Sequence, residues 1–230
     1  FHLKINVIIK KTNQLTSKKG RNLMGNFFGP DMLLRIPALL IAITFHEFAH
    51  ARVSSSLGDP TPKWSGRLSL NPLAHLDPIG LLMLWIFKFG WAKPVEINPM
   101  YYKDPKKGII LVSLAGPLTN LLLALLSLII LKLNLFSNWI FESFIYILFL
   151  YNIVLDVFNL IPIPPLDGSK ILIGLLPSRR TYVFHKLEAY GPIILIILAY
   201  LGILNTIMSP LITFVHAGLD TISNLVLFRF

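Results

Sequence analysis

The residues from Gly108 to Leu131 form an apolar run without a single charged side chain. A helix of this length, rising about 1.5 Å per residue, can cross a hydrocarbon core of about 30 Å. Only 14% of the 230 residues are charged and 54% are hydrophobic, whereas soluble domains carry about 25% charged residues. Spanning segments must satisfy their own backbone polar groups, and a long apolar run does so as a helix. The sequence therefore predicts a multi-pass, helical membrane protein.

The predicted fold is an all-α polytopic bundle with about four to five spanning helices. A membrane-associated loop region, either re-entrant or a β-hairpin, completes it. After a basic segment at 1–23, residues 24–230 are expected to form one domain. Its predicted parts are a helix at 31–57, a loop region at 58–107, helices at 108–131 and 139–161, a turn with a short helix at 162–177, and a helical region at 190–230.

Three local features refine this prediction. The apolar run at 79–87 is too short to span with confidence, so we expect it to be re-entrant or interfacial. Short strands are predicted around 64–70 and 94–97. In the last apolar segment, Pro210 predicts a kink or break, because proline removes a helical hydrogen bond.

The first predicted helix carries His46, Glu47 and His50 in the pattern His-Glu-x-x-His. The two histidines are one turn apart and project from the same face. Two imidazoles so placed can ligate one zinc ion, and the carboxylate between them can serve as a general base. A chance motif on a core helix is the bland alternative. Ionisable groups are rare in membrane helices unless they face a protein interior or water, so the pattern favours a metal site.

A second motif, Asn-Leu-Ile-Pro-Ile-Pro-Pro-Leu-Asp-Gly, occupies residues 159–168 after a later apolar helix. The prolines end that helix, and Gly168 permits a tight turn beside Asp167. A carboxylate held there can supply a third zinc ligand. Two His and one Asp with an open fourth position are typical of catalytic rather than structural zinc. Taken alone, the same residues would be interpreted as an interfacial turn.

Together the two motifs resemble those of the site-2 protease family, the intramembrane zinc metalloproteases, in its compact form without a PDZ or CBS domain. The family pattern N-x-x-P-x-x-x-L-D-G is matched throughout 159–168, and the similarity extends from Phe45 to Gly174. The resemblance implies a zinc endopeptidase that hydrolyses peptide bonds in or near transmembrane segments of membrane-protein substrates. It implies one Zn²⁺ per chain, held by His46, His50 and Asp167.

The resemblance also implies catalytic roles for Glu47 and Asn159 and places Asn120 near the substrate. For Asn120, an interhelical hydrogen bond is an equal alternative. Asn152, Asp156 and Asn159 recur at spacings of four and three and so share one helix face. We expect this face to look toward the zinc, and we assign Asp156 no catalytic role.

The net charge of +10 does not indicate nucleic-acid binding, because the positive charges lie in short segments between apolar runs. Lysines and arginines precede the helix at 108–131 and follow the helix at 139–161, whereas the link between them has only Lys132. This places the link outside and the active site within reach of the cytoplasm of a prokaryotic cell. The basic residues at 1–23 oppose that orientation, so we interpret them as not native, with Met24 as a candidate start.

A metal-ion transporter that uses the same His and Asp residues is the alternative from another functional class, since intramembrane polar residues also mark ion paths. A transporter needs no Glu beside the first His, which favours the protease. An inactive protease-like scaffold is a third interpretation, and no motif supports it. The expected partners are single-span or other membrane proteins as substrates, and the lipid bilayer, with homo-oligomerisation left open.

Overall fold

The computed structural model describes residues 32–78, 80, 92–135, 138–176 and 187–228. Within this part of the chain the regular structure is helical and no β-strand forms. Four helices there are long and apolar enough to cross a membrane: α2 (Met32–Ser56), α5 (Pro105–Leu133), α6 (Trp139–Asn159) and α10 (Ile203–Phe228). The predicted all-helical, polytopic class is thus confirmed.

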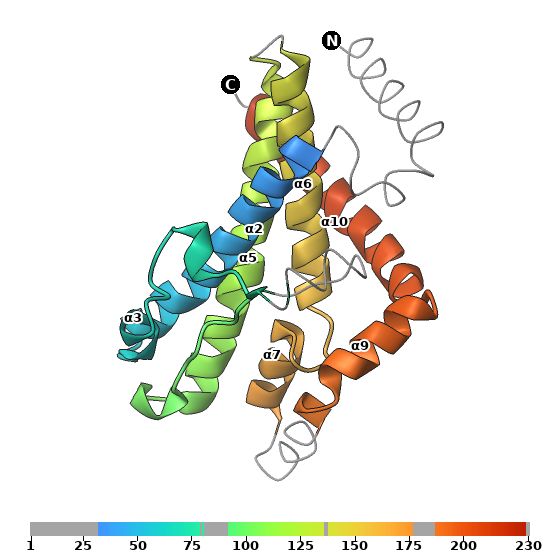
Figure 1. The fold of residues 1–230 in the computed structure, drawn as a ribbon. Helices are drawn as coiled ribbons and strands as arrows, with labels where there is room; N and C mark the ends of the chain where they lie inside the picture. The colour runs from blue at the N-terminus through green and yellow to red at the C-terminus, as the bar shows by residue number, and fades with distance from the viewer. Residues whose placement is uncertain (1–31, 79, 81–91, 136–137, 177–186, 229–230) are drawn as a thin grey trace.

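The centre of the molecule is the packed group of α2, α5 and α6 (Figure 1). Small and polar side chains lie between these helices, and Ala42, Asn120 and Asn152 are completely buried. Lipid tails are as apolar as leucine, so membrane helices associate through close packing and interhelical hydrogen bonds rather than hydrophobic burial. The polar interior is therefore part of what holds the three helices together. An apolar cluster joins α5 and α6 to α10.

Capping residues fix where the central helices begin and end. Helix α5 starts at Pro105, earlier than predicted, because the Asp104 side chain accepts a hydrogen bond from Lys107 N at 3.1 Å. It ends at Asn134, whose φ of 48° is left-handed. Helix α6 starts after Asn138, which accepts a hydrogen bond from Ile140 N at 2.9 Å. The predicted helices are present, with boundaries shifted by a few residues.

The prolines after α6 turn the chain into a short helix, α7 (Asp167–Leu175), which packs against α5. A Cβ at Gly168 would lie 2.2 Å from the carbonyl oxygen of Leu160. Only glycine permits this close approach between the end of α6 and the start of α7. The turn leaves Asp167 as the first residue of α7, facing back toward the bundle.

The C-terminal region contains α9 (Gly191–Tyr200) and α10, and the break between them corrects a prediction. It falls at Gly202, and Pro210 lies inside α10, so the predicted break at Pro210 is wrong, whereas a kink there stays a prediction. Gly202 has a φ of +72°, and its N–H reaches Ala199 O at 3.1 Å. Glycine adopts this conformation at no steric cost and so ends α9, whereas a helix held by flanking turns and neighbours tolerates one proline.

The loop region contains α3 (Thr61–Trp64) and two 3₁₀ turns, η2 (Pro72–Ala74) and η3 (Pro99–Tyr101). The prediction of strands around 64–70 and 94–97 is wrong. Residues 64–70 turn back on α3 instead, and both Arg67 N and Leu68 N donate to Pro62 O. One isolated bridge joins Leu76 to Ala92. The run at 79–87, apart from residue 80, lies outside the described residues.

Candidate metal centre

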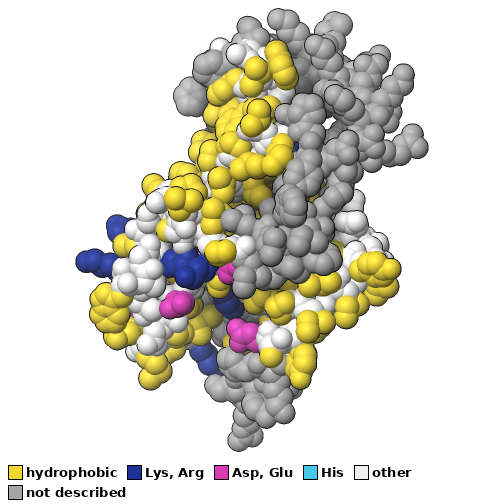
Figure 2. All heavy atoms as spheres, viewed as in Figure 1, with side chains coloured by type: hydrophobic (Ala, Val, Ile, Leu, Met, Phe, Trp, Pro, Cys, Tyr) yellow, Lys and Arg dark blue, Asp and Glu magenta, His cyan; other side chains and the backbone are white. Residues whose placement is uncertain are grey.

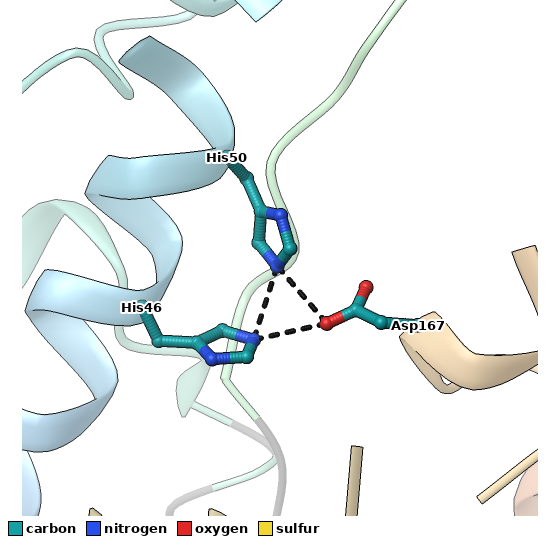
Figure 3. Close-up of side chains that lie close together, drawn as sticks. All are labelled: His46, His50 and Asp167. Carbon is teal, nitrogen blue, oxygen red and sulfur yellow. Dashed lines mark hydrogen bonds and ion pairs between the residues drawn. The ribbon is translucent and has the colours of Figure 1, made fainter. Parts of the chain in front are cut away.

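His46, His50 and Asp167 come together in the centre of the bundle, as the motifs predicted (Figure 3). The Oδ2 atom of Asp167 lies 3.1 Å from His46 Nε2 and 3.0 Å from His50 Nε2. The two Nε2 atoms are 3.0 Å apart. All three residues are buried, with exposures of 5%, 7% and 6%. Three potential ligand atoms from two segments far apart in sequence thus converge on one point.

The local folding of each segment explains this convergence. On α2, His46 and His50 are four residues apart, so their rings project from one face and meet edge to face with centroids 4.6 Å apart. The turn after α6 delivers Asp167 from the opposite side. A carboxylate binds a metal ion in its ionised form, and neutral histidines bind it through a nitrogen lone pair.

The outer nitrogen of each histidine is held by α5. His46 Nδ1 lies 2.5 Å from Asn120 Oδ1, and His50 Nδ1 lies 2.6 Å from the carbonyl oxygen of Val112. Both partners accept, so each Nδ1 is assigned the hydrogen and each Nε2 keeps its lone pair. This is the arrangement that orients histidines around a metal.

Behind His46 the hydrogen bonds continue to a third helix. Asn120 Nδ2 donates to Ala42 O at 3.2 Å and to Asn152 Oδ1 at 2.7 Å, and Asn152 Nδ2 donates to Leu148 O at 2.8 Å. Sequence reasoning placed Asn152 on the inward face of its helix but gave it no role. The structure places it in a hydrogen-bonded chain that fixes the Asn120 amide and, through it, the His46 ring.

Gly116 on α5 provides the space for the histidines. A Cβ there would lie 2.4 Å from His50 Nε2 and 2.5 Å from His46 Cε1. Any side chain would press on the two rings at their metal-facing side, so the helix can approach α2 this closely only with glycine.

The donor set fits zinc. In a tetrahedral site with bonds of about 2.0–2.1 Å, neighbouring ligand atoms lie about 3.3 Å apart. The separations here are 3.0, 3.0 and 3.1 Å. Two imidazole lone pairs aimed at one carboxylate oxygen call for a cation between them, and the nitrogen and oxygen donors suit Zn²⁺. With three protein ligands, the fourth position is left for water or substrate.

Glu47 lies beside the triad on α2 and is half-buried. Its Oε2 accepts a hydrogen bond from the backbone N–H of Val95 at 3.2 Å. On α7, Lys170 lies one turn from Asp167, with Nζ 3.8 Å from the outer oxygen Oδ1. Neither contact was evident from the sequence. The Glu47 contact depends on how two distant segments pack, and the Lys170 contact depends on the rotamer of the lysine.

The other predicted residues of α6 lie at different depths. Asp156 is 3% exposed and, among the described residues, its carboxylate has no hydrogen bond or ion pair. Asn159 is half-buried, and its Nδ2 donates to Leu155 O of its own helix at 3.0 Å. The inward face is therefore confirmed for Asn152 and Asp156, and the catalytic role of Asn159 stays a prediction.

Comparisons with known proteins connect this geometry to a family. The model of peptidase family M50 matches residues 134–202. The chain is 37% identical over 196 residues to "Putative zinc metalloprotease YwhC" of Bacillus subtilis, which covers 81% of this chain and 88% of that relative. It is 32% identical over 184 residues to "Putative zinc metalloprotease Rip2" of Mycolicibacterium smegmatis, covering 75% and 69%. No solved structure matches the chain.

A more distant likeness, 27% over 194 residues, joins it to a "Zinc metalloprotease" of Methanocaldococcus jannaschii and covers 82% of this chain and 49% of that relative. The relatives' names agree with the donor set and do not favour a transporter. The first relative is similar over nearly its whole length, and the helices suit a membrane protein. This chain therefore belongs to peptidase family M50, the site-2 protease family, and is a zinc metalloprotease.

Proposed function

We propose that this protein hydrolyses peptide bonds in or near the transmembrane segments of other membrane proteins. The observation that carries the proposal is the position of the triad. Its three ligand atoms lie within 3.1 Å of one another, buried between helices long enough to span a membrane. A metalloprotease built for soluble substrates has no need to bury its centre in such helices.

In this proposal His46, His50 and Asp167 hold one zinc ion per chain. When bound, zinc supplies a Lewis acid that polarises a peptide carbonyl and makes water nucleophilic near neutral pH. Glu47 acts as the general base and then returns the proton to the leaving amine. Asn159 donates to the substrate backbone or to the developing oxyanion, a contact typically worth about 100- to 1,000-fold in rate.

Asn120 was predicted to lie near the substrate. Its Oδ1 and Nδ2 atoms are both engaged, by His46 on one side and by Ala42 and Asn152 on the other. We therefore propose that Asn120 affects the substrate through the orientation of His46.

The substrate must expose a peptide bond, because a hydrogen-bonded helix shields its own backbone. Residues 93–98 run extended past Glu47, and none of them belongs to a sheet. This supports binding of an unwound substrate segment by strand addition, a common way to hold a peptide for cleavage.

The charge distribution supports access from the cytoplasm. Most Lys and Arg side chains visible in Figure 2 lie over the half of the molecule that contains α3 and the start of α5. Positive residues gather on the cytoplasmic side of membrane proteins. Helix α7, which begins at Asp167, lies toward this half in Figure 1, so water and substrate would reach the centre from there. The bacterial and archaeal relatives support a prokaryotic membrane.

The test is cleavage of a panel of single-span membrane proteins by purified protein in detergent, with and without a chelator. Glu47→Gln should keep its zinc and lose about 100- to 10,000-fold in rate. Glu142→Gln, at an exposed position on α6, is the matched control and should keep both. Cleavage that persists in Glu47→Gln would contradict the proposal, as would zinc transport into liposomes that requires His46.

A further inference from the structure

The extended residues 93–98, called the strap below, lie along α2 and are tied down at three points. Lys93 N donates to His75 O at 2.9 Å. Val95 N donates to Glu47 Oε2 at 3.2 Å, and Asn98 N donates to Asp59 Oδ2 at 2.8 Å. Two of the three backbone donors thus reach carboxylates, one on α2 and one just beyond its end.

The spacing of these two contacts matches on both segments. The carboxylate of Asp59 also accepts a hydrogen bond from Ser54 Oγ at 2.8 Å, so the second contact sits at the end of α2. Seven helical residues separate Glu47 from Ser54, which is about 10 Å at about 1.5 Å per residue. Three extended residues separate Val95 from Asn98, also about 10 Å. The two contacts can therefore form together when the strap lies in this register.

Asp59 is itself rigidly held. It is 1% exposed, and its other oxygen accepts a hydrogen bond from Thr61 N at 2.9 Å. Ser54 is completely buried, and its Oγ also forms a hydrogen bond of 2.8 Å with the hydroxyl of Tyr102. A buried carboxylate needs such donors to remain ionised. The same donors make Asp59 a fixed anchor for the strap.

We propose that Asp59 is a positioning residue for Glu47 and acts through the strap. Asp59 sets the register of residues 93–98, and the Val95 N–H then fixes one oxygen of the Glu47 carboxylate. The other oxygen, Oε1, is left to take the proton. A glutamate side chain has several rotatable bonds, and a general base must stay within hydrogen-bond reach of its proton. The inference rests on the proposed function, in which Glu47 is that base.

The first test removes the donor at Val95. Val95→Pro deletes the N–H, and proline suits an extended segment. Val95→Ala keeps the N–H and measures the cost of the lost side chain, so the effect of the donor is the ratio between the two variants. We expect kcat to be about 10- to 100-fold lower in Val95→Pro than in Val95→Ala, with KM and zinc content alike. Equal kcat values would overturn the inference.

The second test removes the anchor. Asp59→Asn replaces one accepting oxygen with a donor and should lower kcat about tenfold without loss of zinc. The matched control is Asp104→Asn, whose carboxylate also accepts from a backbone N–H but caps α5 instead. In a Glu47→Gln background, Asp59→Asn should cost no more than about twofold further, because coupled residues are not additive. An undiminished loss in that background would mean that Asp59 acts elsewhere.

A third measurement separates this inference from the proposed function. The chain has no cysteine, so Ile97→Cys provides a single thiol in the half-buried middle of the strap. Labelling by a water-soluble maleimide should become several-fold faster with Asp59→Asn and stay unchanged with Asp104→Asn. If no substrate is cleaved by the wild type, the proposed function fails while faster labelling still supports the anchoring. Unchanged labelling overturns the inference whatever the activity.

Discussion

The candidate metal centre and the C-terminal arm, α9 and α10, are held in place by different means. In the most apolar stretch of α5, 39% of the residues are buried, against 11% in α10. Around the centre, hydrogen bonds link α2, α5, α6 and α7 through His46, Asn120 and Asn152. The arm presents large apolar side chains outward along most of its length. Polar contacts within a membrane fix geometry, whereas an apolar surface only fixes depth.

Among the described residues, a polar cluster attaches the arm to α5. Lys132, near the end of α5, forms an ion pair with Asp220 Oδ1 at 2.6 Å and donates to Ser223 Oγ and Asn224 Oδ1, both at 2.7 Å. Ser223 is completely buried. This cluster lies at the end of the bundle away from α7 (Figure 1). This polar attachment lies far from the centre, whereas Leu195 and Leu204 of the arm pack on Ile161 and Leu166 in the turn before Asp167. We expect the polar attachment and the centre to respond to different substitutions.

The largest expected effect comes from the ligands. Asp167→Ala should abolish zinc binding and reduce cleavage to the level seen with a chelator, because two histidines alone hold the ion poorly. Metal analysis of the purified protein and a cleavage assay measure both. The comparison is Asp220→Ala, which removes a half-buried carboxylate from the arm and should keep its zinc. An Asp167→Ala protein that still binds zinc and cleaves substrate would contradict the role of Asp167 as a zinc ligand.

A smaller effect is expected from the residues that hold the partner of His46. Asn152→Ala deletes an acceptor for the Asn120 amide and should weaken zinc binding about 10- to 100-fold, as outer contacts of ligating histidines usually do. Competition with a chelator of known affinity measures this. The control is Asn138→Ala, since Asn138 only caps α6. This variant should lower the free energy of unfolding by about 1 kcal/mol and leave zinc affinity unchanged. A loss of zinc affinity in Asn138→Ala would show that any destabilisation of α6 weakens zinc binding.

A substitution that weakens the attachment of the arm should lower stability and leave zinc binding unchanged. Lys132→Met removes a charged donor that is mostly buried and should destabilise the fold by about 1–3 kcal/mol, measured by unfolding in detergent, with unchanged zinc content. Lys107→Met breaks an exposed pair with Asp104 at 3.6 Å and should change stability by less than about 0.5 kcal/mol. Zinc loss in Lys132→Met would mean that the arm and the centre form one cooperative unit.

The smallest effect concerns pH. Burial would raise the pKa of Asp59, but hydrogen bonds from Thr61, Asn98 and Ser54 lower it below its usual value of 3.8. A carboxyl with a lowered folded-state pKa adds stability above its unfolded pKa and loses it as pH falls through the folded one. The wild type should therefore lose its stability advantage over Asp59→Asn below about pH 4. Melting temperatures of both proteins between pH 7 and 3 test this, and a constant difference would contradict it.

Much of this protein could be predicted from short-range patterns. Apolar runs without charge specify helices long enough for a membrane, because length and composition are local properties. The spacing of His46 and His50 places both on one helix face, and the prolines before Asp167 predict a turn. The break at Gly202 was missed because Pro210 is the stronger helix breaker in isolation, whereas the structure has left-handed backbone at Gly202, between α9 and α10.

Other features were decided only when distant segments came together. Asp167 lies 121 residues from His46 and meets it because the turn after α6 points back into the bundle. The Asn120–Asn152 hydrogen bond and the strap against Glu47 join helices and loops whose relative register no local pattern encodes. The sequence by itself determined which residues can bind a metal and which segments are helical. The tertiary structure decided which amide contacts His46 and which N–H donates to the Glu47 carboxylate, because those contacts depend on packing between elements.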